Sequence, residues 1–235
     1  MMKRYVLIKM GGKGTRFGSE IPKQFCEVEK DKPLFTYVLE QYKKADFIDG
    51  FIIVTNEDWI EYTKQIASPI LGDRLIEIVQ GGNSNAASAK AGVECARKYL
   101  DDNDILVMHD VTNPIVDLDG VKKVIEAAEK YSFASAYTEQ VQAIYQKDEN
   151  DFVSSSLQKS EIASGYSPEA FNFTAIYNCY ANATEDELSN AFSSPAIAAK
   201  HGQKTKLIKI NALSLKITYA EDLEIFKYLY KYFLQ

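Results

Sequence analysis

The loop after the first predicted strand carries glycines and cations at a spacing that suits a polyphosphate. The apolar run 5–10 ends in bare backbone, at Gly11, Gly12 and Gly14. Arg16 and Lys23 follow in the same loop. Glycines let backbone N–H groups approach phosphate oxygens without interference from a Cβ atom, and the two cations would neutralise the phosphate charge. We therefore predict a nucleotide triphosphate site in the stretch Tyr5–Gln24.

Two familiar phosphate loops do not fit this spacing. The Walker pattern, Gly-x-x-x-x-Gly-Lys-Ser/Thr, is absent. A dinucleotide fingerprint opens directly into a helix, whereas here Gly18 comes one residue late and Pro22 keeps Ile21 extended. The sequence thus predicts a long loop that wraps a ligand, and the simpler alternative is an ordinary turn after a strand.

A second polar cluster follows a later predicted strand. Its members are short or lack a side chain, namely Gly81, Gly82, Asn83 and Ser88. Such a segment could hydrogen-bond the edge of a nucleotide base through main-chain groups and the Ser88 hydroxyl. The alternative is a helix N-cap formed by Asn83, Ser84 or Asn85. A cap and a base pocket are compatible.

Two more candidate groups end predicted strands. Asp110 follows His109, and its carboxylate could hold a magnesium ion or orient a hydroxyl group. The alternatives are that Asp110 only begins a loop and that His109 is a satisfied core residue. Lys216 stands between Leu215 and Ile217, so its side chain is expected to point away from theirs. It is either a solvated charge or a phosphate ligand.

Predicted strands and helices alternate along most of the chain. The strands are predicted at 5–10, 51–55, 75–80, 105–109, 133–137 and 204–210. The helices are predicted at 34–44, 57–66, 86–100, 118–131, 171–181, 185–200 and 220–233. This order predicts a single Rossmann-like α/β domain, residues 1–235, with a mostly parallel sheet and helices on both faces. Ligands of such sheets bind beyond the carboxyl ends of the strands, where these polar clusters fall.

The pattern changes between residues 137 and 167. Two predicted strands, 141–146 and 152–157, flank a polar turn at 147–151. We predict a protruding β-arm at about 138–163, inserted in the domain; the alternative is a flexible loop. The main sheet has no evident room for the apolar residues of the arm, so we predict that two arms pack together in a homodimer. Lys159, at the base of the arm, would then reach the site of its own chain or of its partner.

Composition excludes several classes of protein. The net charge of −6 argues against a nucleic-acid partner. The sequence offers no apolar run of roughly 20 residues, so no membrane partner is expected. The three isolated cysteines predict reduced thiols in a cytoplasmic protein, and with only two histidines a zinc site is not expected.

Together these motifs resemble the cytidylyltransferase family that includes 2-C-methyl-D-erythritol 4-phosphate cytidylyltransferase and ribitol-5-phosphate cytidylyltransferase. The resemblance covers nearly the whole chain, in order. Its segments are Gly11–Arg16 with Pro22–Gln24, Gly81–Gly82 with Ser88 and Ala91–Gly92, His109–Asp110 with Pro114, Ser167–Phe171, and Leu215–Thr218 with Glu221–Leu223.

The resemblance implies a reaction as well as a fold with an arm and a homodimer. Members of the family join CTP to a phosphorylated alcohol, with Mg²⁺, and release a CDP-alcohol and pyrophosphate. The implied phosphate ligands are Arg16, Lys23 and Lys216. The implied acceptor-side residues are Asp110, Asn113 and Thr218, and Asp110 is also the candidate metal ligand.

The chain departs from the family pattern on the acceptor side. Asn85 and Asn113 stand where the family has arginines. Lys159 stands where an arginine contacts the acceptor phosphate; a lysine keeps the charge and loses the bidentate fork. Asparagines suit hydroxyl groups. These changes favour a polyol phosphate over methylerythritol phosphate as acceptor.

Three functions remain open at this point. The first is an active cytidylyltransferase that serves a surface polysaccharide or isoprenoid precursors. The second is a nucleotidyltransferase of the same fold that uses another base or a sugar 1-phosphate. The third is a non-catalytic nucleotide-binding relative. The intact cations Arg16, Lys23 and Lys216 favour catalysis.

Overall fold

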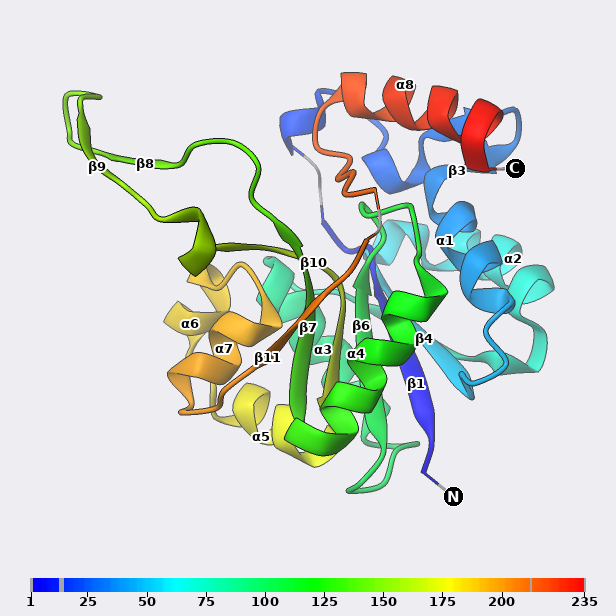
Figure 1. Ribbon diagram of the computed structural model, residues 1–235. Helices are drawn as coiled ribbons and strands as arrows, with labels where there is room; N and C mark the ends of the chain where they lie inside the picture. Colours follow the sequence, from blue (N-terminus) through cyan, green and yellow to red (C-terminus); the bar gives the residue numbers. More distant parts are fainter. Residues whose placement is uncertain (1, 13–14, 212, 235) are drawn as a thin grey trace.

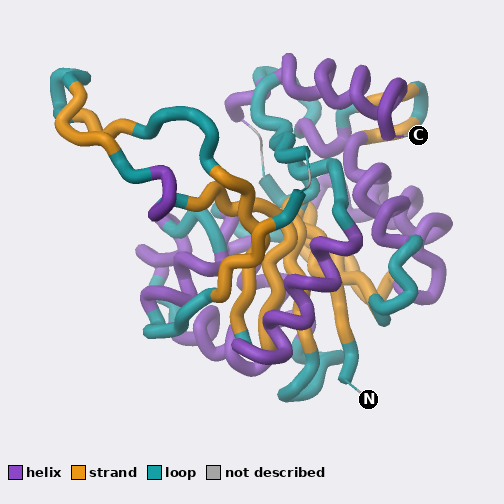
Figure 2. The backbone as a smooth tube through the Cα atoms, viewed as in Figure 1, coloured by secondary structure: helices purple, strands orange, loops and turns teal. Residues whose placement is uncertain are grey.

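A seven-stranded sheet forms the centre of the protein in a computed structural model that describes residues 2–12, 15–211 and 213–234 (Figures 1 and 2). Its strands are β1 (Arg4–Lys9), β4 (Gly50–Thr55), β5 (Leu75–Gln80), β6 (Ile105–Asp110), β7 (Phe133–Glu139), β10 (Ala163–Asn172) and β11 (Lys206–Lys209). Two small sheets pair β2 (Glu27–Glu29) with β3 (Lys32–Pro33) and β8 (Tyr145–Lys147) with β9 (Val153–Ser156). The helices are α1 (Leu34–Lys43), α2 (Ile60–Leu71), α3 (Asn85–Ala96), α4 (Leu118–Tyr131), α5 (Phe173–Asn182), α6 (Glu185–Asn190), α7 (Ser194–Lys200) and α8 (Ala220–Leu229).

The strand order in the main sheet is β11-β7-β10-β6-β1-β4-β5. The pairs β1–β4, β1–β6, β4–β5 and β7–β11 are parallel, and β10 runs antiparallel to both of its neighbours. The predicted α/β fold with a mostly parallel sheet is confirmed. From β1 the chain adds strands on one side of the sheet, β4 and then β5, and afterwards returns to add β6 on the other side of β1. Such a switch point is where open α/β sheets bind ligands.

Alternate residues of β1 supply the two halves of the core. Val6 and Ile8 pack with residues of α1, α2 and α4 on one face of the sheet. Tyr5 and Leu7 pack with residues of α3, α5 and α7 on the other face. Because both faces are covered, the strand is almost continuously apolar, as a buried parallel strand must be.

The structure corrects the predicted secondary structure in two places. Residues 163–172 form strand β10, which was not predicted, because Gly165 and Pro168 interrupt the strand pattern. The register of β10 against β7 shifts between Tyr166 and Glu169, and proline, which cannot donate to a ladder, is tolerated at such an irregularity. The predicted helix 185–200 is two helices, α6 and α7. Residues 191–193 are not helical, and Ser193 then caps the N-terminus of α7.

The predicted arm leaves the sheet after β7 and returns as β10 (Figure 1). Its strands β8 and β9 pair only with each other. The apolar side chains of the arm that are exposed are Val141, Tyr145, Phe152, Val153 and Leu157, with exposed fractions from 45% to 83%.

Within the part of the chain described, no helix is both long and apolar enough to cross a membrane.

Candidate active site

Three adjoining cavities open near the carboxyl ends of the strands in the main sheet. Cavity A, of about 350 Å³, is lined by Lys9, Met10, Gly11, Gly12, Arg16, Lys23, Gln24, Asn85, Ser88, Asp110, Val111, Thr112, Phe192, Lys216 and Thr218. Cavity B, of about 260 Å³, shares Lys9, Asn85, Asp110, Phe192 and Lys216 with cavity A and adds Asn113, Ser135, Ala163, Gly165, Tyr166, Ser167, Glu169, Ser193, Pro195, Leu207 and Ser214. Cavity C, of about 510 Å³, is lined by Gly11, Gly12, Asn56–Asp58 and Gln80–Asn85.

The glycine loop is fixed to the end of β1 by Gln24. This side chain is 1% exposed, and its Nε2 donates to the carbonyl oxygens of Met10 at 2.7 Å and Gly12 at 3.0 Å. The predicted loop residues Gly11 and Gly12 line both cavities A and C. Gly14 lies outside the described residues.

Lys23 and Arg16 both line cavity A. The Nζ of Lys23 donates to the carbonyl oxygen of Ile217 at 2.6 Å, which joins the glycine loop to the C-terminal segment. Burial lowers the pKa of Lys23, and the neighbouring charges of Lys216 and Arg16 lower it further while Asp110 opposes them. A cavity that depresses the pKa of its lysine in this way favours an anionic ligand, which would relieve the crowding of positive charge.

Lys216 reaches the cavities from the segment before α8. Ile217 is fully buried, and its N–H donates to the carbonyl oxygen of Thr112 at 2.8 Å. Lys216 is half-exposed, and its Nζ lies 3.4 Å from Oδ2 of Asp110. The N–H of Thr218 donates to Asp222 at 2.8 Å, and this aspartate also caps α8. The structure thus brings Lys216 and Thr218 into cavity A, and Lys216 also lines cavity B. Thr218, implied on the acceptor side, does not line cavity B.

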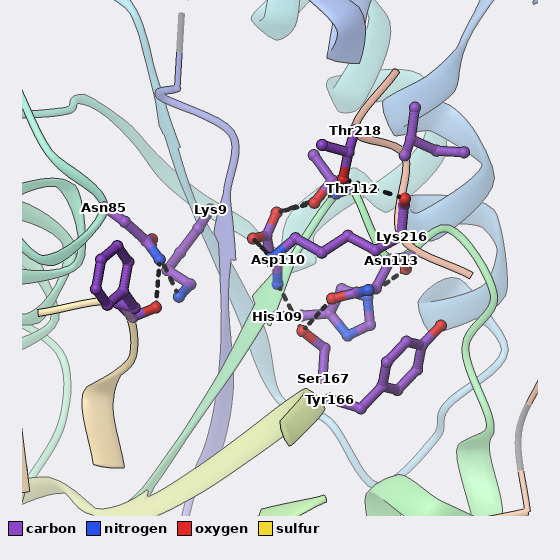
Figure 3. A network of polar contacts seen from close by, with 12 residues as sticks. Lys9, Asn85, His109, Asp110, Thr112, Asn113, Tyr166, Ser167, Lys216 and Thr218 are labelled. Carbon is purple, nitrogen blue, oxygen red and sulfur yellow. Dashed lines mark hydrogen bonds and ion pairs between the residues drawn. The ribbon is translucent and has the colours of Figure 1, made fainter. Parts of the chain in front are cut away.

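Asp110, the last residue of β6, is held in place by three hydrogen bonds with Thr112 and Ser167 (Figure 3). Its Oδ1 accepts from the N–H of Thr112 at 3.1 Å and from the hydroxyl of Thr112 at 2.7 Å, and its own N–H donates to Oγ of Ser167 at 3.0 Å. Burial alone would raise the pKa of this carboxyl, but Lys216 and Lys9 lower it from 3.8 to about 2. Asp110 is therefore a carboxylate at neutral pH.

The lowered pKa of Asp110 has a consequence for stability. A carboxyl whose pKa falls on folding stabilises the native state above its unfolded pKa, and this stabilisation is lost as the pH falls through the folded pKa. Asp110→Asn should therefore lower the free energy of unfolding at pH 7 by roughly 2 kcal/mol. About half of that difference should be gone at pH 3. Urea unfolding of both proteins at the two pH values checks this, and a difference that does not change with pH would contradict it.

His109 and Asn113 serve the frame of the site. His109 is fully buried, its pKa is lowered to about 4 by burial, and its ring lies 2.9 Å from the carbonyl oxygen of Asn113 and 3.0 Å from the hydroxyl of Tyr42. A carbonyl only accepts, so Nε2 carries the proton and Nδ1 accepts from Tyr42. Asn113 is 3% exposed; its amide accepts from Ser167 at 3.1 Å and donates to the carbonyl oxygen of Leu215 at 3.5 Å.

The predicted base-binding residues gather beside the glycine loop. Gly81, Gly82 and Asn83 line cavity C, and Ser88 lines cavity A. A Cβ atom on Gly81 would lie 2.8 Å from Oγ of Ser88, and a Cβ atom on Gly11 would lie 3.0 Å from it, so the three positions touch. Ser84 is the N-cap of α3, accepting from the N–H of Ala87. The N-cap is therefore present, and the glycines beside it still line cavity C.

Lys159 is the predicted residue that the structure does not bring to these cavities. It lies in a short 3-10 helix, Lys159–Glu161, at the base of the arm, and its Nζ donates to the carbonyl oxygen of Val141 at 2.7 Å. It lines neither cavity A nor cavity B of its own chain.

Comparison with known proteins identifies the family. The profile of the 2-C-methyl-D-erythritol 4-phosphate cytidylyltransferase family matches residues 5–231, almost the whole chain. The chain belongs to this family. The resemblance noted from the motifs is confirmed, and the protein is an enzyme of the cytidylyltransferase class.

Individual members of the cytidylyltransferase family agree with this assignment. The 2-C-methyl-D-erythritol 4-phosphate cytidylyltransferase of Clostridium beijerinckii is 28% identical over 225 residues, covering 96% of this chain and 97% of the relative. The fold is that of the 4-diphosphocytidyl-2C-methyl-D-erythritol synthase of Anaerococcus prevotii, with a TM-score of 0.80 at 20% identity, covering 98% of this chain and 96% of that one. The Francisella tularensis cytidylyltransferase has a TM-score of 0.78 at 16% identity and covers 96% and 99%.

The sequence analysis of this cytidylyltransferase gave no individual role to four residues of the site. Lys9 and Glu169 carry charge into the cavities, Gln24 fixes the glycine loop, and Phe192, 92% exposed, lines both cavities A and B. Lys9 could have been noticed in the sequence, because it is a charged residue at the end of an otherwise apolar strand. Phe192 gave no signal, because it was placed inside a continuous helix.

Proposed function

We propose that the protein transfers the cytidylyl group of CTP to a phosphorylated alcohol and releases pyrophosphate. The observation that carries the proposal is the wall shared by cavities A and B, where Lys216 and Asp110 line both. Cavity C and the glycine loop would hold the cytidine and the triphosphate, and cavity B would hold the acceptor. The acceptor phosphate would then face the α-phosphorus of CTP across the shared wall.

Direct displacement suits these side chains. An oxygen of the acceptor phosphate forms a bond to the α-phosphorus, the bond from that phosphorus to the bridging oxygen of the β-phosphate breaks, and pyrophosphate leaves with the electron pair. The acceptor phosphate is already an anion at neutral pH, so positioning and charge neutralisation are what the reaction needs. Arg16 and Lys23 would stabilise the departing pyrophosphate, and Lys216 would hold the reacting phosphates.

Magnesium is the metal that this site would take. Mg²⁺ binds one or two carboxylates together with substrate phosphate oxygens, and Asp110 is the one carboxylate among the described residues lining cavity A. Those described residues include no cluster of three or more metal-ligating side chains, so the phosphates of CTP would complete the coordination. The bound ion would offset charge on the triphosphate.

Methylerythritol 4-phosphate is the first acceptor to test. The expected preference for a polyol phosphate has no support from the comparisons, since the family and its curated relative are methylerythritol phosphate enzymes. The expected preference assumed that Asn85 and Asn113 bind hydroxyl groups of the acceptor. In the structure the amide of Asn85 contacts Lys9 and the carbonyl oxygen of Phe192. The amide of Asn113 contacts Ser167 and the carbonyl oxygen of Leu215. Both asparagines therefore use part of their hydrogen-bonding capacity within the protein.

Glu169 is a better candidate for recognition of an acceptor hydroxyl. It lines cavity B, and its buried Oε2 accepts no hydrogen bond from the described residues. A hydroxyl group of the acceptor would satisfy this oxygen, whereas leaving it unpaired costs free energy. Steady-state kinetics on methylerythritol, ribitol and glycerol phosphates test the assignment. We expect methylerythritol phosphate to have the highest kcat/KM, and a clear preference for ribitol or glycerol phosphate would overturn the order.

The arm supports the proposal of a homodimer. Its exposed apolar side chains need a partner surface, and its base carries Lys159, which does not reach the cavities of its own chain. We propose that two arms pack together and that Lys159 serves the site of the partner. The whole chain, 1–235, would then act as one domain with an inserted arm at about 138–163.

Deleting residues 141–158 should convert a dimer into a monomer. The expected result follows from burial of the apolar side chains of the arm between two chains. Light scattering at micromolar concentration measures the mass, with a Phe152→Ser/Val153→Ser variant to test the same side chains within an intact arm. A monomeric wild-type protein would refute the dimer.

The proposed site of action is the cytoplasm. Cys26, Cys95 and Cys179 are all free thiols, which suits a reducing compartment that also supplies CTP.

A further inference from the structure

Lys9 is a buried ammonium group with too few partners. It ends β1, whose preceding residues are apolar, and it is 8% exposed. An ammonium group has three donors, but among the described residues Nζ makes one hydrogen bond, to Oδ1 of Asn85 at 3.4 Å. Burying a charge in this way is costly unless it is paired. Lys9 lies close enough to Asp110 to lower the pKa of that carboxyl, but Asp110 also pairs with Lys216, so the position has room for a further anion.

The charges around Lys9 point the same way. The described lining of cavity A holds four cations, Lys9, Arg16, Lys23 and Lys216, against the single carboxylate of Asp110. Asp110 already lies 3.4 Å from Lys216 (Figure 3). Cavity A thus carries an excess of positive charge that one carboxylate does not neutralise, as expected of a site for phosphate groups.

The cavities divide these cations into two sets. Arg16 and Lys23 line cavity A only, whereas Lys9 and Lys216 line both cavity A and cavity B. In Figure 3, Lys9 and Lys216 lie on either side of Asp110. Lys216 is half-exposed on a loop. Lys9 lies on a central strand, and its ammonium group is hydrogen-bonded to Asn85. The ammonium group of Lys9 is therefore held more closely than that of Lys216 at the junction of cavities A and B.

We propose that Lys9 binds the phosphate group of the acceptor at the junction of cavities A and B. The inference rests on the proposed function and adds a specific ligand to it. Lys9 and Lys216 would hold the attacking phosphate from opposite sides, while Arg16 and Lys23 hold the pyrophosphate portion of CTP. Two anionic phosphates repel each other, and the pair of lysines offsets that repulsion where they meet. Asn85 orients the ammonium group through its side-chain oxygen.

Replacing Lys9 with methionine tests the inference, because methionine keeps the length and removes the charge. We expect KM for the acceptor to rise by roughly 10-fold or more and kcat/KM to fall by roughly 10²-fold. The affinity for a non-hydrolysable CTP analogue, measured by calorimetry, should stay within about threefold. The melting temperature of the free protein should not fall, because the variant removes a weakly paired buried charge.

A second variant restores the charge from a neighbouring position. Asn85 lines the same two cavities and contacts Lys9, so Lys9→Met/Asn85→Arg should recover part of the lost kcat/KM. A merely structural role for Lys9 would show as a lower melting temperature in Lys9→Met and no recovery in the double variant. Lys64→Met, on the exposed face of α2, is the matched control and should behave as wild type.

Inorganic phosphate separates failure of the inference from failure of the proposed function. With the CTP analogue bound, phosphate should raise the melting temperature of the wild type and have no such effect on Lys9→Met. Wild type that turns over no acceptor but shows this difference would refute the proposed reaction and leave the phosphate site standing. Equal protection of both proteins, or a loss of analogue affinity with an unchanged acceptor KM, would overturn the inference.

Discussion

Replacing Lys23 with methionine should lower kcat by roughly 10²-fold or more while the protein stays folded. Lys23 lines cavity A beside the glycine loop, where positive charge already exceeds negative charge. Its ammonium group would stabilise charge that develops on the pyrophosphate as the bond to the α-phosphorus breaks. Steady-state pyrophosphate release measures the loss, and thermal unfolding measures the fold.

Other variants define what that loss means. Arg16→Ala should act in the same direction, because both cations line cavity A. Lys23→Met loses the hydrogen bond to the carbonyl oxygen of Ile217, which is worth about 1 kcal/mol of stability. The variant also removes a buried amino group whose pKa is already lowered by burial, so the net decrease in the free energy of unfolding should be small. Lys64→Met is the control and should turn over substrate as the wild type does. Near-normal turnover in Lys23→Met and Arg16→Ala would contradict the assignment of these two cations to the triphosphate.

Replacing Gly12 with alanine should lower kcat/KM for CTP by roughly 10²-fold, the scale of misplacing a substrate by about 1 Å. A Cβ atom on Gly12 meets nothing within 4 Å, and the backbone of Gly12 does not have the positive φ that would strain alanine. The fold should therefore accept the change. The new methyl group would instead occupy space beside cavities A and C, where the phosphates would approach the backbone.

The matched control for Gly12→Ala is Gly165→Ala. Gly165 also has open space around its Cβ position and lacks a positive φ, but of cavities A, B and C it lines only B. Its CTP affinity should be unchanged, as measured by calorimetry. If Gly12→Ala bound CTP as tightly as wild type, the glycine loop would not be the phosphate cradle.

The sequence was informative where one kind of signal extended over a whole element. Apolar strands and amphipathic helices located most of the sheet, and the glycine loop with Arg16 and Lys23 located cavity A. Strand β10 was missed because Gly165 and Pro168 are locally unfavourable in a strand, and only its long-range pairing with β6 and β7 stabilises it.

The site was less predictable where its residues depend on tertiary contacts. Glu169 enters cavity B only because β10 lies beside β6, and no local pattern shows this. Asn113 was expected to face the acceptor and lines cavity B, but its hydrogen bonds to distant segments, at Ser167 and Leu215, could not be read from the sequence. Lys159 illustrates a further limit, since it lines neither cavity A nor cavity B of its own chain, and the sequence does not show whether it would serve its own site or that of a partner.

Pyrophosphate release from each of the four nucleoside triphosphates, with methylerythritol phosphate and Mg²⁺, tests the central claim most directly. Gly81, Gly82 and Ser88 lie beside the glycine loop, where the base would bind, and the family is one of cytidylyltransferases. We predict release from CTP well above that from ATP, GTP or UTP, together with a CDP-alcohol whose mass matches the acceptor. Faster release with a purine nucleotide, or CTP binding without release for any alcohol phosphate, would contradict the account.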